Sequence, residues 1–186
     1  MEEKAETNKL NIPYQVDYRN IKYPRLEFKT GTLLLVLPKN YREKEKLIQK
    51  HKKWIYTKNL IIKTALEEAK NKKLNLTRTE KELKEFVHSI ASDFARKYNF
   101  RINKIYFRKM KTKWGSYSKK GNLTINTLLK YLPDKLIEYI IFHEMAHSIE
   151  RKHNERFWNI INKKFKDYET KEKNLLVYWF LVQTVI

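Results

Sequence analysis

Residues 143–158 read HEMAHSIERKHNERFW and contain three of the five histidines in the chain. His143 and His147 are four residues apart, so on a helix they lie about 40° apart around the axis and about 6 Å apart along it. Both imidazoles can therefore face one metal ion. Glu144 lies about 100° further round, where its carboxylate can reach a water on that ion without binding the ion itself. This spacing predicts a metal site that carries out hydrolysis.

A catalytic zinc site normally has three protein ligands, and His153 is the natural third candidate. On an unbroken helix His153 would lie about 9 Å beyond His147, which is too far to share an ion. We therefore expect the helix to end within residues 148–152 and the chain to fold back, although Glu150 stands where related motifs carry glycine. Asn154 is expected to cap the next helix. If His153 faced solvent, the next candidate ligands would be Glu155, Glu169 and Glu172.

The competing interpretation is a helix that merely carries histidines. The helix before His143 is apolar on the neighbouring stripe, and Glu144 falls within that stripe. An unpartnered carboxylate is costly to bury, so a structural role for this group is disfavoured. The other two histidines, His51 and His88, lie in separate helical segments and are interpreted as surface or packing residues.

Composition narrows the chemistry. The chain of 186 residues has no cysteine, which excludes disulfides, a cysteine nucleophile and thiolate zinc ligands.

The net charge of +20 suggests an anionic partner such as DNA, although a lysine-rich composition alone is the competing explanation. The N-terminus has no apolar signal segment, and the longest apolar run, residues 175–182, is far shorter than the roughly 20 residues needed to span a bilayer. We expect a cytoplasmic protein that does not enter membranes, and the oligomeric state is left open.

The surrounding pattern predicts an α+β fold. Alternating apolar residues from Ile12 to residue 37, with a turn at 29–32, predict an N-terminal antiparallel β-meander after a frayed tail at 1–10. Residues 41–73 have helical spacing and predict one long basic helix or two broken ones. A capping box from Thr79 to Glu82 predicts the start of another helix. Strands are expected at 102–110 and 123–126, with a turn at 119–122, and Pro133 begins the helix that carries the histidines. We expect a first domain at 1–78 and a second at 79–186, joined in one compact unit.

Residues 108–158 carry a longer set of motifs: R-x-M-x-x-x-W-G-S, a strand with asparagine, a proline, HE-x-x-H, and a third histidine followed by F-W. The residues are Arg108, Met110, Trp114, Gly115, Ser116, Asn126, Pro133, His143, Glu144, His147, His153, Phe157 and Trp158. In these motifs the sequence resembles the YgjP-like metallopeptidase domain, a family related to the SprT and WLM zincins.

The resemblance implies a zincin-like fold, in which a short sheet packs on the HExxH helix and further helices follow. It also implies a Zn²⁺ ion held by His143, His147 and His153, with Glu144 as general base. The family pattern does not ask for glycine at position 150. Tyr117 stands where the family often has cysteine, so no thiol-dependent role carries over.

The stretch WGSYSKKGN is expected to form a strand, a turn and a second strand. An edge strand beside the metal site would bind an extended peptide by β-augmentation. The predicted substrate-binding residues are Trp114, Gly115, Ser116, Tyr117 and Arg108. The alternatives are that Trp114 belongs to the core, that Gly115 forms a bulge, and that Arg108 lies on a solvated strand face.

The most favoured function is a zinc-dependent metallopeptidase that hydrolyses peptide bonds with a Glu-activated, zinc-bound water, acting on a protein or peptide substrate. Two alternatives remain. One is a nucleoside-triphosphate (UTP) pyrophosphatase that uses the same metal site, and the other is a nucleic-acid-binding protein with a structural metal. Structural zinc usually has four protein ligands, which disfavours the last, because only three good candidates are present.

Overall fold

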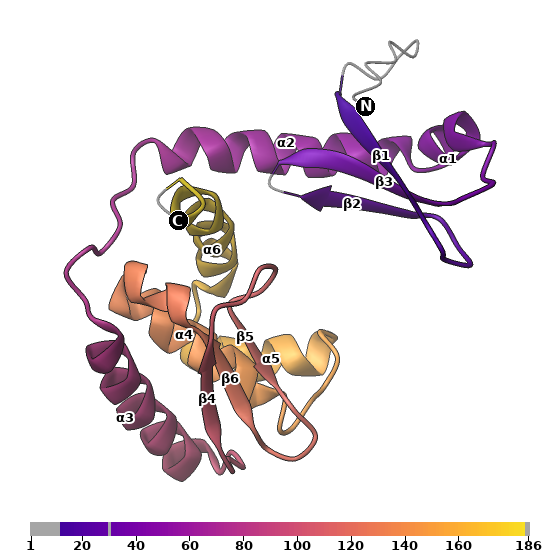
Figure 1. Cartoon of the computed structure of the whole chain (residues 1–186). Coiled ribbons are helices and arrows are strands. Elements are labelled where there is room, and N and C mark those ends of the chain that lie inside the picture. Colours follow the sequence, from indigo (N-terminus) through magenta and orange to yellow (C-terminus); the bar gives the residue numbers. More distant parts are fainter. Residues whose placement is uncertain (1–11, 30, 185–186) are drawn as a thin grey trace. The chain divides into compact units, whose positions relative to one another are not determined.

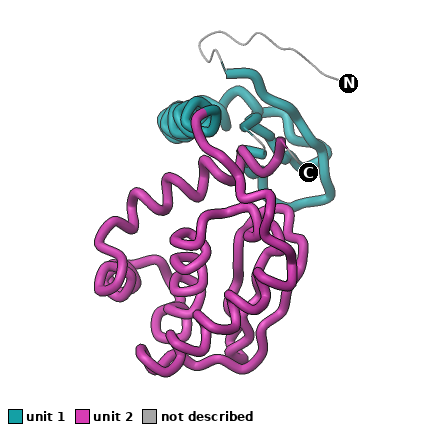
Figure 2. The backbone as a smooth tube through the Cα atoms, turned by 90° about the vertical axis from the view of Figure 1, so that its left-hand side faces the viewer, with its two compact units in different colours: residues 1–70 teal, residues 71–186 magenta. Residues whose placement is uncertain are grey.

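Figure 1 shows the computed structural model, which describes residues 12–29 and 31–184. The expected frayed tail at 1–10 lies outside the described residues. The chain forms two compact units, Met1–Lys70 and Asn71–Ile186, which Figure 2 distinguishes by colour. The domain division expected at residue 78 stays a prediction, because compactness alone does not define parts that fold independently.

The first unit contains a three-stranded sheet of β1 (Tyr14–Arg19), β2 (Arg25–Lys29) and β3 (Thr32–Pro38), in the order β1-β3-β2. β2 and β3 form an antiparallel hairpin, and Gly31 in its turn has a φ of 89°. β1, however, pairs with β3 in parallel, so the predicted antiparallel meander is wrong. β3 is the most buried strand, with Leu35 and Val36 fully inaccessible, and it takes the central position where both of its edges are paired. Alternating apolar residues predict strands but carry no information on this order.

Two helices follow the sheet, α1 (Lys44–Lys50) and α2 (Lys52–Ala69). The two helices meet at the half-buried His51. Of the two alternatives expected from the sequence, the structure therefore has the two broken helices. Ile55 of α2 and Leu47 and Ile48 of α1 pack with the strand residues Leu33, Leu35 and Leu37 in the core of this unit.

The second unit begins with α3 (Glu80–Tyr98), whose predicted capping box is confirmed. The Thr79 hydroxyl accepts from the Glu82 amide at 3.2 Å, and the Glu82 carboxylate accepts from the Thr79 amide at 2.7 Å. Asn99 ends the helix in the left-handed conformation, with a φ of 54°.

A second small sheet contains β4 (Ile105–Arg108), β5 (Gly115–Tyr117) and β6 (Leu123–Asn126), in the order β4-β6-β5. β6 is central, parallel to β4 and antiparallel to β5, so β5 is an edge strand. The expected strand, turn and strand over residues 114–126 are confirmed.

The remaining elements are η1 (Thr127–Tyr131), α4 (Asp134–Ala146), α5 (Glu155–Lys164) and α6 (Tyr168–Val182). Within this unit the core joins α3, β6, α4, α5 and α6, and its largest fully buried side chains include Tyr139, Phe142 and Phe157. The short sheet lies beside α4, as Figure 1 shows. The chain therefore has the predicted α+β architecture, with a short sheet beside the α4 helix and further helices after it. Among the described residues, no helix combines the length and apolar character that crossing a bilayer requires.

Candidate metal centre

The α4 helix positions His143, Glu144 and His147, and it ends where the third histidine requires it to end. Its last residue is Ala146, and His147 is its C-cap, slightly before the expected range of 148–152. The chain then turns through residues 147–149 and reaches α5, where the predicted cap is confirmed: Asn154 Oδ1 accepts from the Phe157 amide at 3.0 Å.

The turn needs no glycine. Within the described part of the chain, Asn99 is the one non-glycine residue with positive φ, so residues 148–153 all have backbone conformations that ordinary side chains adopt. Glu150 contributes twice: its carboxylate accepts from the Lys152 amide at 3.1 Å, and its carbonyl oxygen lies 3.0 Å from His147 Nδ1. The residue at the expected glycine position therefore holds the turn and orients a histidine.

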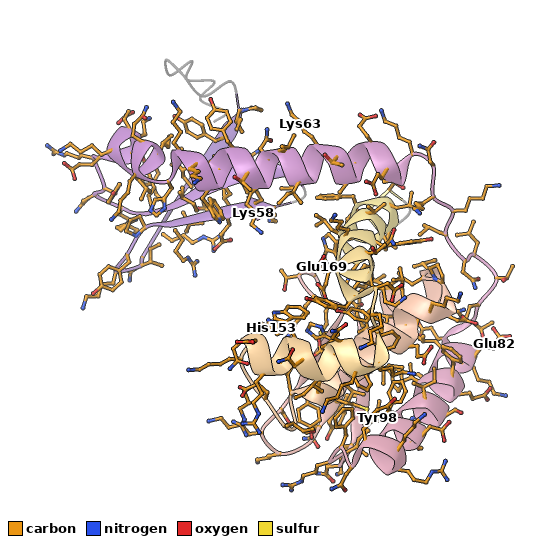
Figure 3. All side chains as sticks on the ribbon, turned by 180° about the vertical axis from the view of Figure 1, so that it is seen from behind. Lys58, Lys63, Glu82, Tyr98, His153 and Glu169 are labelled. Atoms are coloured by element: carbon orange, nitrogen blue, oxygen red, sulfur yellow. The ribbon has the colours of Figure 1, made fainter. Side chains whose placement is uncertain are left out.

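The three imidazoles converge. His153 Nε2 lies 3.1 Å from His143 Nε2 and 3.1 Å from His147 Nε2. Ligand nitrogens about 2.0–2.1 Å from a tetrahedral zinc ion are about 3.3 Å apart, so these residues fit such an ion closely. One ligand atom from each of the three histidines lies within 4.8 Å of the others. His153 is exposed at the start of α5, where Figure 3 labels it, so the group is accessible from solvent.

The Phe157 ring packs against all three histidine rings. Its ring centroid lies 5.0 Å from that of His143 and 4.7 Å from those of His147 and His153. Phe157 is fully buried, and its neighbour Trp158 stacks on Tyr168 at 5.0 Å. The prediction that Phe157 and Trp158 anchor this helix is confirmed, and the same phenylalanine limits how the imidazoles can move.

A carboxylate from α6 lies behind His143. Glu172 Oε1 is 3.3 Å from His143 Nδ1, which has no aligned hydrogen bond, so the contact is mainly electrostatic. The Tyr139 hydroxyl donates to the same Glu172 oxygen. Burial raises the pKa of Glu172, but the contacts with His143 and Tyr139 outweigh it and leave that pKa below its usual value. The sequence suggests Glu172 only as a substitute ligand, and it gives no signal for Tyr139.

Glu144 lies against the edge strand β5. A Cβ atom placed on Gly115 would lie 2.7 Å from Cγ of Glu144, closer than side chains approach. The β5–β6 register runs without interruption from Gly115 opposite Ile125 to Tyr117 opposite Leu123, so Gly115 does not form the bulge that was the alternative. Burial raises the pKa of Glu144, while His143 and Lys113 act in the opposite direction.

A groove of about 380 Å³ runs along β5 past Glu144. The residues that line it are Gly115, Ser116, Tyr117, Ser118, Lys119, Glu144, His147 and Arg151. Three of the predicted substrate-binding residues, Gly115, Ser116 and Tyr117, thus lie beside the histidine group. The Tyr117 hydroxyl donates to the Arg101 carbonyl oxygen, so it is not a free donor.

The other two predicted substrate-binding residues lie elsewhere. Trp114 is half-buried, donates from Nε1 to the Leu175 carbonyl at 3.3 Å, and meets Trp179 edge to face at 4.9 Å. These contacts are those of a packing residue. Arg108 is exposed on β4, at the opposite edge of the sheet from β5, with its guanidinium 5.7 Å from the Tyr106 ring centroid.

Asn126 is a site-positioning residue whose role the sequence did not indicate. It is fully buried, and its Nδ2 donates to the carbonyl oxygens of Met110 and Lys113 at 2.9 Å each. Its Oδ1 accepts from the amides of Met110 at 3.2 Å and Leu128 at 3.1 Å. All four hydrogen-bonding positions of the amide are used, and they fix the loop that delivers Gly115 to Glu144.

The second unit thus brings three histidines together beside the edge strand β5, as the sequence motifs predict. The sequence model of the YgjP-like metallopeptidase domain matches residues 57–177, and the chain belongs to this family. The resemblance found in the motifs is thereby confirmed.

Two solved structures are similar to parts of the chain. The metallopeptidase zymogen of Pyrococcus abyssi abylysin is 23% identical with a TM-score of 0.42, covering 47% of this chain and 87% of that chain. The metallopeptidase zymogen of Methanocaldococcus jannaschii jannalysin is 27% identical with a TM-score of 0.43, covering 54% of this chain and 97% of that chain. None of the curated proteins compared with the chain matches it. These comparisons give no support to a pyrophosphatase or to a binding protein with a structural metal.

Proposed function

We propose that the chain is a zinc-dependent metallopeptidase in which His143, His147 and His153 bind the ion and Glu144 is the general base. The observation that carries the proposal is the convergence of the three histidines. His153 Nε2 lies 3.1 Å from His143 Nε2 and 3.1 Å from His147 Nε2. The Glu144 carboxylate, which is not one of the three ligands, lies beside them. The family membership supports peptide-bond hydrolysis as the reaction.

The protonation of the ligands favours metal binding. Burial lowers the pKa of His147 and of His153, so both rings stay neutral to lower pH than a free imidazole. A neutral imidazole is the form that binds a metal. The contacts of His147 Nδ1 with the Glu150 carbonyl and of His143 Nδ1 with Glu172 leave each Nε2 directed at the shared position.

When bound, zinc would polarise the scissile carbonyl and make a water in the site more acidic. A Glu144 carboxylate oxygen accepts a proton from the water that adds to the carbonyl carbon. The same oxygen then delivers this proton to the amine as the C–N bond breaks. The raised pKa of Glu144, which burial causes, makes its carboxylate a better proton acceptor than an exposed glutamate.

The edge of β5 supports an extended substrate. The Asn126 amide donates to the Trp114 carbonyl, and the Ser118 amide donates to the Asn122 carbonyl. Trp114 and Ser118, which flank β5, therefore direct these main-chain groups toward β6. In an antiparallel ladder the direction alternates, and the main-chain groups of Gly115 and Tyr117 therefore point away from β6. A peptide strand added at this edge would run along the groove past Glu144.

The test compares the wild-type protein with Glu144→Gln and with a matched control, Glu169→Gln, in which the same change is made at an exposed residue of α6. Bound zinc and hydrolysis of an unfolded protein are measured, with UTP as a second substrate. We expect about one zinc per chain in all three proteins, proteolysis in the wild type and control, and its loss in Glu144→Gln. A well-folded wild type that takes up no zinc would overturn the proposal.

Binding of DNA or another polyanion is a separate prediction. Its basis is the basic helix α2, where Lys58 and Lys63 are exposed, as Figure 3 shows. If these lysines bind DNA, the affinity falls steeply with salt and does not depend on Glu144.

A further inference from the structure

We propose that the groove along β5 binds a carboxylate of the peptide substrate through Arg151 and Lys119. The inference rests on the proposed peptidase function and adds a substrate class to it. Lys119 belongs to the turn that follows β5, and Arg151 belongs to the loop between the turn at 147–149 and α5. Two segments that are distant in the sequence thus bring a cation each to the groove that contains Glu144.

Neither of these cations forms an ion pair with the protein in the part of the chain that the structure describes. Glu144 is the one carboxylate among the residues that line the groove, and it is packed against Gly115. The nearby Glu150 carboxylate accepts a hydrogen bond from the Lys152 amide and is not paired with the Arg151 side chain. Both cations are exposed and available to a ligand.

Arg101 adds a third positive charge beside the groove. Its Nε lies 3.4 Å from the position that a Cβ on Gly121 would occupy, and the Tyr117 hydroxyl lies 3.5 Å from the same position. The guanidinium therefore lies next to a tyrosine that lines the groove. Burial raises the pKa of Tyr117, and the positive charges of Arg101 and Arg151 oppose this rise.

The chemistry of the groove favours a carboxylate. A guanidinium binds a carboxylate with two parallel hydrogen bonds, and an ammonium adds a compact point charge. A lysine or arginine of the substrate at this position would meet two like charges instead. The carboxylate has two possible sources in a peptide, namely an aspartate or glutamate side chain and a free C-terminus, and the experiment distinguishes them.

The experiment uses the zinc-loaded full chain and quenched fluorescent peptides of one sequence. A single residue is glutamate, glutamine or lysine, moved through the positions that flank the scissile bond, and each peptide is made with a free and an amidated C-terminus. We expect kcat/KM for the preferred carboxylate peptide to exceed that of its neutral partner roughly fivefold, as for an exposed ion pair. About 1 M salt, where the Debye length is about 3 Å, removes most of the difference.

Variants assign the preference to the groove. Arg151→Gln and Lys119→Gln are expected to reduce it, and Arg151→Glu is expected to favour the lysine peptide. Lys166→Glu makes a similar change of net charge at an exposed lysine outside the groove and keeps the wild-type preference. Zinc content and circular dichroism confirm that each variant is folded.

The outcomes separate the two proposals. Hydrolysis of neutral and acidic peptides at equal rates, or a preference that survives in both Arg151→Gln and Lys119→Gln, overturns the carboxylate site and leaves the peptidase standing. No hydrolysis of any peptide by the zinc-loaded wild type overturns the peptidase itself. The binding of the same peptides to the inactive Glu144→Gln variant gives a second measurement, in which the acidic peptide binds more tightly.

Discussion

Gly115 on the edge strand and Glu144 on α4 are in such close contact that only a hydrogen atom fits between them. A Cβ on Gly115 would lie 2.7 Å from Cγ and 3.1 Å from Oε1 of Glu144. Glycine is required at position 115 because the Glu144 side chain comes so close. Its backbone conformation does not require glycine, since the β5–β6 register is regular. Strand β5, which is proposed to hold the substrate, therefore packs directly against Glu144, the proposed general base. Each of the two limits the position of the other.

The first prediction concerns Gly115→Ala. The added methyl group displaces the Glu144 side chain, and a displacement of about 1 Å in a catalytic group costs about 100-fold in rate. We expect kcat to fall by this order while zinc content stays unchanged, because the histidines are not displaced. Thr124→Ala, on the opposite face of the neighbouring strand, serves as the control. A Gly115→Ala variant with wild-type kcat would show that the position of Glu144 does not limit the reaction.

The second prediction concerns Glu172→Gln. The change keeps the shape of the side chain but removes the negative charge 3.3 Å from His143 Nδ1. Loss of such a carboxylate behind a ligating histidine typically weakens metal affinity about 10- to 100-fold. Zinc affinity is measured by competition with a chelator, and Glu169→Gln on the same helix is the control. Equal affinities for the two variants would show that Glu172 serves only to pair with Tyr139.

The local parts of this centre could be predicted from sequence because a few neighbouring residues determine them. Helical spacing places His143 beside His147, and Asn154 followed by an amphipathic segment predicts the cap that begins α5. The need for a break before His153 follows from helix length alone, since an unbroken helix would carry that residue out of reach. Even the absent glycine is explained locally, by Glu150 and a turn without positive φ.

Contacts between distant segments could not be predicted in the same way. Glu172 reaches His143 across 29 positions in the chain because α6 packs beside α4, and no spacing rule connects them. The parallel pairing of β1 with β3 likewise depends on which strand is buried most deeply, not on the alternation that predicts each strand. Arg108 is near the predicted substrate residues in sequence, yet the order β4-β6-β5 separates it from them in space.

The third prediction concerns Asn126→Ala. The substitution removes the hydrogen bonds to Met110, Lys113 and Leu128 and leaves the buried Leu128 amide and three part-buried main-chain groups without these partners. Each unsatisfied group costs about 1–3 kcal/mol. The loss in the free energy of unfolding should therefore be several times the loss that a surface substitution causes. Urea unfolding followed by circular dichroism measures the loss. Thr124→Ala on the same strand is the control, and equal stability of the two variants would contradict the assigned role.

The last prediction concerns the capping box of α3 and its dependence on pH. Hydrogen bonds from the Thr79 backbone and side chain lower the pKa of Glu82 below its usual 4.5. The folded state therefore holds this carboxylate ionised at pH values where the unfolded chain has begun to protonate it. Its contribution to stability is present in full above pH 4.5 and is lost as the pH falls through the lower, folded-state pKa.

Urea unfolding of the wild type and of Glu82→Gln at a series of pH values between neutrality and strong acid measures this contribution. The wild type is expected to be the more stable protein at neutral pH, and the difference should shrink below pH 4.5. Glu80→Gln removes a charge from the same first turn without touching the capping box, so it accounts for the interaction of that charge with the helix dipole. A difference between wild type and Glu82→Gln that stays constant to strong acid would mean that Glu82 caps the helix without the ionised carboxylate that the geometry requires.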